Sequence, residues 1–265
     1  MHKKLFSFVS IVFCSAFFIS AAFCQTNAAP VKVVLVEGGS FMMGGKDAGP
    51  IHKMSVASFY MMTTEVTQEL YTEIHGENPS YHEGKNLPVE LVSWIDVAYF
   101  ANALSKRDGL KPVYTFTIDY GVVDPAANGW RMPTEAEWEY AARGGKLSKN
   151  YTYSGSDKID EVAWYAENSG RETRQVGQKK PNELGLYDMS GNVGEWCNDL
   201  FDDYSAGIPS SPSELIKKGN TYVFFVYRGG HVEDNPEDAT VTFRHNDTIF
   251  FKGADVGIRL VRNVK

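Results

Sequence analysis

Long stretches without hydrophobic periodicity constrain the fold of this chain more than any other feature. The stretches 144–190 and 202–220 are rich in glycine, asparagine, aspartate, serine and proline, and neither has the spacing of a helix or a strand. A compact domain rarely carries this much irregular chain unless the loops are packed and functional. We find no internal repeat that would indicate a solenoid. The short regular segments that remain favour an α+β domain.

Three helices are indicated by their start signals. Thr67 is expected to cap the first, and Ser93 with Asp96 forms a capping box ahead of the second. Thr134 with Glu137 forms a capping box ahead of the third. A cap fixes where a helix begins, so these residues predict the starts of three helices.

Short runs rich in β-branched and aromatic residues are the expected strands. They are Val31–Val36, Val56–Met62, Val113–Ile118, Tyr222–Arg228, Ala239–Arg244 and Gly257–Val261. Together with the helices, they predict a loop-rich α+β fold with few helices and short antiparallel strands. No shift in composition marks a second domain.

Residues 1–24 have the pattern of a secretory signal peptide. Two lysines at positions 3 and 4 precede an almost uninterrupted apolar run, with small residues near its end. A membrane anchor and a lipoprotein signal with Cys14 or Cys24 as the lipidated residue are the alternatives. We expect cleavage, a short lead over 25–32 and one domain over 33–265. The protein would then be exported to the periplasm, the cell envelope or the medium.

Charge and cysteine content exclude several classes. The net charge of −7 argues against nucleic-acid binding, which needs a basic surface. Removal of the signal would leave Cys197 as the only cysteine, so a disulfide scaffold is excluded. No later apolar run is long enough for a bilayer span, and we expect no integral membrane segment in the mature chain.

Several segments are too specific to result from composition. Two long ones are GWRMPTEAEWEYAARGG at 129–145 and GLYDMSGNVGEW at 185–196. Shorter ones are VEGGSFMMG at 36–44, TEVT at 64–67, NPS at 78–80, LPVELVSW at 87–94, RGG at 228–230 and GIR at 257–259. In this order they resemble the formylglycine-generating enzyme (sulfatase-modifying factor) family across about residues 33–262. The resemblance implies a variant of the C-type lectin fold.

The resemblance also implies a calcium site in the second long motif. Its ligands would be the side chains of Asp188 and Glu195 and the carbonyls of Gly191 and Val193. Calcium prefers carboxylate and carbonyl oxygens in a tightly turned loop, which this segment offers. The alternative is a loop whose carboxylates cap backbone amides without a metal. A second calcium site of the family would start at Asn168, where a later carboxylate partner is missing.

Catalysis in aerobic members of this family uses copper(I), held by two cysteines shortly after the Arg-Gly-Gly. Copper(I) requires soft thiolate ligands. Counted from Arg228, the two positions carry Asp234 and Ala239, and no cysteine follows Cys197. We therefore expect no copper and no formylglycine chemistry of this type. The alternative is an oxidoreductase of the same family that acts on a protein or a small thiol through a non-standard site.

Polar and acidic residues crowd the segment where the cysteines would stand. The candidate ligand-binding residues are His231, Glu233, Asp234, Glu237, Asp238, Phe243 and His245. A rigid β scaffold that presents polar and aromatic side chains is typical of a recognition surface, although a solvated loop explains the charges equally well. The resulting hypothesis is a calcium-stabilised, lectin-like module that binds a protein or a glycan.

Overall fold

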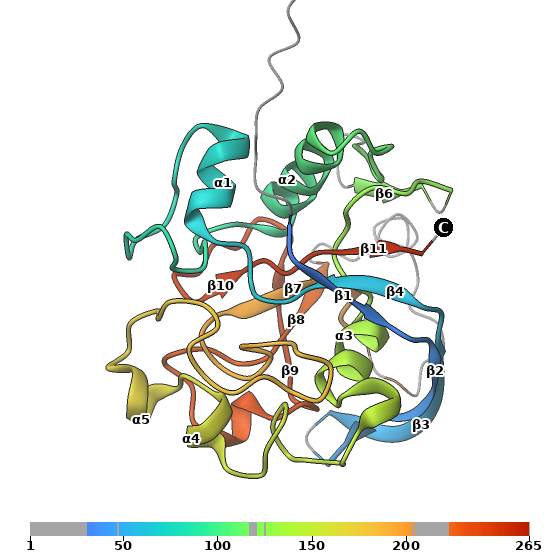
Figure 1. The fold of residues 1–265 in the computed structure, drawn as a ribbon, viewed down its shortest axis with the longest axis vertical. Helices are drawn as coiled ribbons and strands as arrows, with labels where there is room; N and C mark the ends of the chain where they lie inside the picture. Colours follow the sequence, from blue (N-terminus) through green and yellow to red (C-terminus); the bar gives the residue numbers. More distant parts are fainter. Residues whose placement is uncertain are drawn as a thin grey trace, which may run out of the picture. The chain divides into compact units, whose positions relative to one another are not determined.

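Short strands are grouped along the chain and separated by helices in the computed structural model (Figure 1). The structure describes residues 31–46, 48–116, 121–124, 126–202, 204 and 223–264. Residues Lys32–Lys265 form one compact unit. The expected signal peptide, with Cys14 and Cys24, lies outside the described residues.

The strands are β1 (Val33–Val36), β2 (Gly39–Gly45), β3 (Gly49–Val56), β4 (Phe59–Met62), β5 (Tyr114–Phe116), β6 (Gly121–Val123), β7 (Gly194–Leu200), β8 (Phe224–Arg228), β9 (Arg244–Thr248), β10 (Val256–Gly257) and β11 (Val261–Asn263). The helices are α1 (Gln68–His75), α2 (Trp94–Arg107), α3 (Glu135–Ala142), α4 (Ile159–Val162) and α5 (Ala166–Ser169), with the 3-10 helices η1 (Gly145–Leu147) and η3 (Pro236–Ala239).

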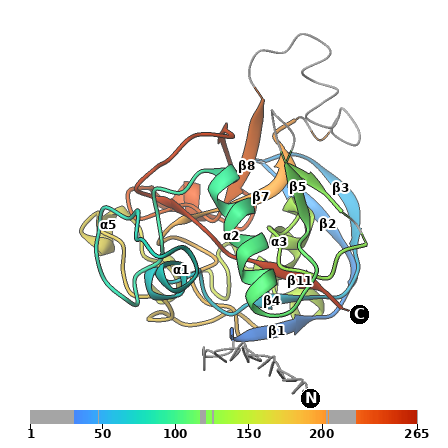
Figure 2. The same ribbon diagram turned by 90° about the horizontal axis from the view of Figure 1, so that it is seen from above.

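Two small sheets and two hairpins organise the described residues. One sheet has the order β1-β4-β11, and the other has the order β10-β7-β8-β9 with a parallel β10-β7 pair. The strand pairs β2-β3 and β5-β6 complete the set. In Figure 1, α1 and α2 lie above the strands β1, β4 and β11, and α3 lies below them. Figure 2 shows α2 running across the middle of the unit with α1 beside it.

The three capped helices begin where the sequence predicts. Thr67 accepts a hydrogen bond from the backbone N–H of Leu70. Ser93 opens α2 through a reciprocal capping box with Asp96, and Thr134 opens α3 through one with Glu137. Each cap satisfies amides that the first turn of a helix leaves without partners. The α+β, loop-rich fold class is confirmed.

Helix α3 is central to the core. All of its residues are buried, and its Trp138 packs in a cluster that includes side chains from both sheets. Met61 and Val261 enter this cluster from the three-stranded sheet, and Cys197 and Val226 enter it from the four-stranded sheet. The helix therefore links the two sheets through one apolar core.

The irregular stretch 144–190 is packed against this core. Asn182, which is 6% exposed, donates from Nδ2 to the carbonyl of Ala141 and to Ser154 Oγ. Its Oδ1 accepts from the backbone N–H groups of Leu184 and Leu186. One buried amide thus replaces the backbone partners that a regular element would supply.

Part of the strand prediction is wrong. The run Ala239–Arg244 is not a strand, because Pro236 starts a 3-10 helix and the hydroxyl of Thr240 accepts from the N–H of Phe243 to close a turn. The strand begins only at Arg244. The hairpin β2-β3 and strand β7 were not predicted. The glycines of β2 carry little strand propensity, and β7 contains glycine, glutamate, asparagine and aspartate, which are depleted in strands.

Candidate functional site

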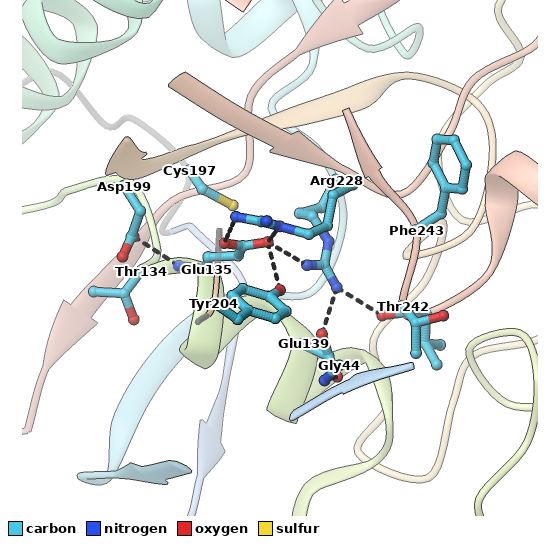
Figure 3. A network of polar contacts seen from close by, with 12 residues as sticks. Gly44, Thr134, Glu135, Glu139, Cys197, Asp199, Tyr204, Arg228, Thr242 and Phe243 are labelled. Carbon is cyan, nitrogen blue, oxygen red and sulfur yellow. Dashed lines mark hydrogen bonds and ion pairs between the residues drawn. The ribbon is translucent and has the colours of Figure 1, made fainter. Parts of the chain in front are cut away.

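A buried ion-pair network anchors the Arg-Gly-Gly segment at the end of β8. Arg228 is 0% exposed and donates from Nη1 to Glu135 Oε1 at 2.6 Å and from Nη2 to Glu139 Oε2 at 2.7 Å. Figure 3 shows the guanidinium between these two carboxylates of α3. Arg228 also donates to the carbonyl of Val241 and lies over the ring of Trp138 at 5.1 Å. These contacts fasten strand β8 to helix α3.

The carboxylates of α3 are all engaged in structural ion pairs. Glu135 also accepts from Arg244 Nε at 2.6 Å, and Glu139 pairs with Arg143. Glu137 pairs with Arg131 while it closes the capping box. Alternate spacing on a helix separates the three groups, and each finds an arginine instead of a second carboxylate. The geometry supports anchoring and not acid–base catalysis for this motif.

The two glycines after Arg228 reverse the chain. Gly229 and Gly230 have φ values of +104° and +70°, the left-handed region that favours glycine. A Cβ on Gly230 would lie 2.8 Å from the carbonyl oxygen of Asp238 and 2.8 Å from the Cα of Ala239. The returning loop therefore packs directly onto Gly230, and the buried Ala239 is held there.

Two histidines and two aspartates meet beside this turn, and we call them the His/Asp cluster: His231, Asp234, His245 and Asp255. His231 Nε2 lies 3.2 Å from Asp234 Oδ1 and 3.2 Å from Asp255 Oδ2. His245 Nε2 lies 3.4 Å from Asp234 Oδ2. The side chains are 12–26% exposed, so the cluster is shielded but reachable from solvent.

Hydrogen bonds orient the side chains and the loop of the cluster. The N–H of Glu233 donates to His231 Nδ1, and this contact turns His231 Nε2 toward the two aspartates. Asp234 Oδ2 accepts from the N–H of His231 and holds the loop closed. His245 Nε2 is buried and makes no hydrogen bond in the described part of the chain.

Aromatic rings pack under the cluster. Tyr227 stacks on His245 with ring centroids 4.8 Å apart, and Phe243 meets the same imidazole edge-on at 4.7 Å. Burial raises the pKa of Tyr227, and the charges of Asp255, Asp234 and Asp247 raise it further. The charges of three carboxylates therefore act on one tyrosine of β8.

The structure brings together only some of the predicted ligand-binding residues. His231, Asp234, Phe243 and His245 are adjacent. Glu233 and Glu237 are exposed and Asp238 is partly exposed, and no ion pair joins these three to the cluster. Asp255 was missed, because it reaches the cluster from a loop that precedes β10, and no local signal in the sequence marks it.

The predicted calcium segment lies in the interior. Glu195 is 0% exposed, accepts from Arg259 Nε at 2.9 Å and from the indole N–H of Trp138 at 2.6 Å, and is thus already neutralised by an arginine. Asp188 accepts from the N–H of Gly177 at 2.6 Å, and its Oδ1 is buried without a partner in the described residues. Burial raises the pKa of Asp188 to about 6.

Glu65 joins the same interior region and was missed by sequence reasoning. Its carboxyl accepts from Asn192 Nδ2 at 3.0 Å and from the N–H of Val193 at 3.3 Å. Burial raises its pKa well above the usual range, and Asp188 raises it further. The backbone of Gly191 donates to the carbonyl of Gly229.

No three histidine, cysteine, aspartate or glutamate side chains among the described residues are arranged to hold a metal ion. The free oxygen of Asp188 suits a hard cation, whereas the arginine-bound carboxylate of Glu195 does not fit as a ligand in this arrangement. Calcium binding by Asp188, Gly191, Val193 and Glu195 stays a prediction.

Copper(I) does not fit the residues at the Arg-Gly-Gly turn. The two positions that the family uses for thiolates hold the carboxylate of Asp234 and the methyl group of Ala239, and neither is a soft ligand. Cys197 is 0% exposed in the core, and burial raises the pKa of its thiol well above the usual range. A buried, protonated thiol is a poor metal ligand and a poor nucleophile.

Within the described ranges, no helix has both the length and the apolar character needed to cross a bilayer.

The fold and the anchored Arg-Gly-Gly turn define a class: a loop-rich α+β domain of the formylglycine-generating-enzyme type. The chain belongs to the sulfatase-modifying factor family, because the family model described as the sulfatase-modifying factor enzyme 1-like domain matches residues 20–264.

Relatives with different names share this domain. The chaperone protein LppX of Paenibacillus barcinonensis is 37% identical over 87% of this chain and 89% of its own. The formylglycine-generating enzyme of Mus musculus is 31% identical over 72% of this chain and 66% of its own. The solved structure of Treponema denticola variable protein 1 is 30% identical, covers 89% of this chain and 96% of its own, and superposes with a TM-score of 0.80.

Proposed function

We propose that this chain is an exported, non-catalytic member of its family that binds a ligand through the His/Asp cluster. The observation that carries the proposal is the chemistry at the turn after Arg228. An aspartate bonded to its own loop and a buried alanine stand at the positions where the family's copper chemistry needs two thiolates. The scaffold that would present those thiolates is otherwise complete.

The ligand surface of the proposal consists of the four predicted residues that the structure brings together. His231, Asp234, Phe243 and His245 combine hydrogen-bonding groups, charge and an aromatic ring; His245 lies on β9, and the other three lie in the chain between β8 and β9. Such a set is suited to recognition because β8 and β9 hold both ends of the loop that carries it. The name of the relative LppX, a chaperone protein, supports a polypeptide over a glycan as the ligand.

The catalytic alternative is tested by an oxidation assay. A sulfatase-derived peptide with a central cysteine is incubated with the purified protein, copper(I) and oxygen, and formylglycine is measured by mass spectrometry. A formylglycine-generating enzyme assayed alongside is the positive control. We expect no conversion. Turnover by the chain would refute the proposal, and loss of that turnover in Cys197→Ser would assign the reaction to the one cysteine in the described residues.

Calcium is proposed as a structural ion supported by the free oxygen of Asp188. The test is thermal unfolding of chelator-treated protein, with and without added calcium and with magnesium as the control ion. If calcium binds here, calcium but not magnesium should raise the melting temperature, and Asp188→Asn should abolish that rise. Equal curves in chelator and calcium would show that Arg259 alone neutralises this region.

A further inference from the structure

The segment that follows α5 carries three positively charged side chains without a carboxylate partner: Arg171, Arg174 and Lys179. Among the described residues, no aspartate or glutamate lies within ion-pair distance of any of them. The adjacent Lys180, by contrast, pairs with Glu161 at 3.0 Å. In a chain with a net charge of −7, three such cations between positions 171 and 179 are a local exception.

The indole of Trp164 brings these cations together. Lys179 Nζ lies 4.0 Å from the centre of its ring, and the guanidinium carbon of Arg174 lies 6.0 Å from it. A Cβ on Gly170 would lie 3.1 Å from Arg174 Nη2, so Arg174 lies against the turn that Arg171 continues. Two cations therefore border one indole ring, and the third stands at the adjoining turn.

The acceptors that these side chains already have are neutral carbonyls. Arg174 donates from Nε and Nη2 to the carbonyl of Ser169. Lys179 donates from Nζ to the carbonyl of Asp160 at 2.8 Å, while the carboxylate of Asp160 accepts from the hydroxyl of Tyr165. A carbonyl does not cancel a positive charge, and both cations keep N–H groups for a further acceptor.

Two buried donors of the same region have no partner. Trp164 Nε1 makes no hydrogen bond within the described residues, whereas the other four indole N–H groups of the chain each donate to a carbonyl or a carboxylate. Thr173, which is 4% exposed and precedes Arg174, has a buried hydroxyl without a partner. Asn192 holds the two segments together, because its backbone N–H donates to the carbonyl of Trp164 and its Oδ1 accepts from the N–H of Arg174. Unsatisfied donors beside unpaired cations indicate a place for an acceptor with negative charge.

We propose that Arg171, Arg174 and Lys179 bind a phosphate or sulfate group of a ligand. Arginine and lysine side chains recognise such oxyanions, and a tetrahedral group offers several acceptor oxygens at once. The flexible stem of Lys179 lets its ammonium turn from the indole ring to the oxyanion, and the N–H of Trp164 and the hydroxyl of Thr173 are then available as neutral donors. The site shares no residue with the His/Asp cluster, and the proposal does not depend on the binding role of that cluster.

The indole N–H signal of Trp164 reports binding directly, and Trp164→Phe assigns it. Protein labelled with nitrogen-15 is titrated with sodium phosphate and, in parallel, with sodium sulfate, and sodium chloride of the same ionic strength is the control. We expect the signal to shift with a dissociation constant of about 1 mM, while the bonded indole N–H groups keep their positions. If neither anion shifts the signal beyond the chloride control at about 50 mM, the proposal is overturned.

Matched variants separate the site from general charge. Lys179→Met keeps an apolar stem beside the indole ring and removes the ammonium, so it should weaken binding at least about fivefold. Lys180→Met removes the same charge from the next residue, whose ammonium pairs with Glu161, and should change the affinity by less than about twofold. Equal losses in the two variants would show attraction by net charge only and would overturn the site. Arg171→Gln changes an exposed side chain, so its expected loss of about fivefold decides if Lys179→Met fails to fold.

A comparison of anions identifies the group that the ligand carries. Phosphate and sulfate are both tetrahedral, so a shift with either supports the proposal, and the tighter of the two names the group. Acetate has one charge and two oxygens and should bind at least about fivefold more weakly than the tighter anion. Equal affinity for acetate would overturn the assignment to a phosphate or sulfate group.

Discussion

Replacement of Arg228 by methionine should destabilise the fold strongly. Methionine keeps most of the apolar volume of the side chain and removes the guanidinium. The change deletes the hydrogen bonds to Glu135 and Glu139 and leaves the buried carbonyl of Val241 without its arginine donor. It also removes the cation from the face of Trp138.

The magnitude depends on which partners remain. Removal of one member of a buried ion pair typically costs about 3–5 kcal/mol, because the other charge is left unpaired. Here Glu135 keeps Arg244, and Glu139 keeps Arg143 at 2.8 Å and the N–H of Gly44. Both carboxylates therefore stay compensated, and we expect a loss at the lower end, about 3 kcal/mol. For a domain of this size, that corresponds to a melting temperature lowered by roughly 6–12 °C.

Urea unfolding followed by tryptophan fluorescence measures the loss. Arg143→Met is the matched control, because Arg143 pairs with the same Glu139 but its side chain is 18% exposed; it should cost about 1 kcal/mol. The triple change Arg228→Met, Glu135→Gln, Glu139→Gln should lower the stability further, because it also takes the carboxylate partners away from Arg244 and Arg143. A loss below about 1 kcal/mol in Arg228→Met, or equal losses in the two arginine variants, would refute the anchoring role of the network.

Two further predictions concern backbone and pH. Gly230→Ala should cost about 3 kcal/mol in urea unfolding, because its Cβ would meet backbone at 2.8 Å; Gly76→Ala, also at positive φ but with nothing within 4 Å, should cost only about 1 kcal/mol. Burial raises the pKa of Asp199 from 3.8 to about 7, so the folded state binds its proton more tightly than the unfolded state. The resulting stability is fully present below about pH 4 and is lost as pH rises through 7. Asp199→Asn should flatten that part of the curve of unfolding free energy against pH, and an unchanged curve would contradict the assignment.

Local signals account for what the sequence predicts well. The caps Thr67, Ser93 and Thr134 lie within three residues of their partners. Both partners of each contact are therefore visible in one short stretch of sequence. Strands β2 and β7 were missed because pairing partners, not propensity, make them strands.

The candidate site depends on contacts between distant segments. Arg228 meets Glu135 across 93 positions, and Asn192 meets Glu65 across 127. Asp255 enters the His/Asp cluster from a loop whose sequence gives no sign of it. Spacing alone therefore located the segment after Arg228 but not the group of side chains that the fold assembles around it.

The separation of anchor from loop explains how this fold persists without thiolates after the Arg-Gly-Gly. Arg228 fixes β8 to α3 through side chains that lie outside the segment 231–239. The close packing against Gly230 requires a small residue at position 239, where Ala239 stands. The N–H of His231 requires a hydrogen-bond acceptor at position 234, where Asp234 stands. A carboxylate accepts that hydrogen bond better than a sulfur does. Other side chains in the segment 231–239 can thus be substituted without loss of the contacts that stabilise the scaffold. A binding role at this position therefore does not conflict with membership of an enzyme family.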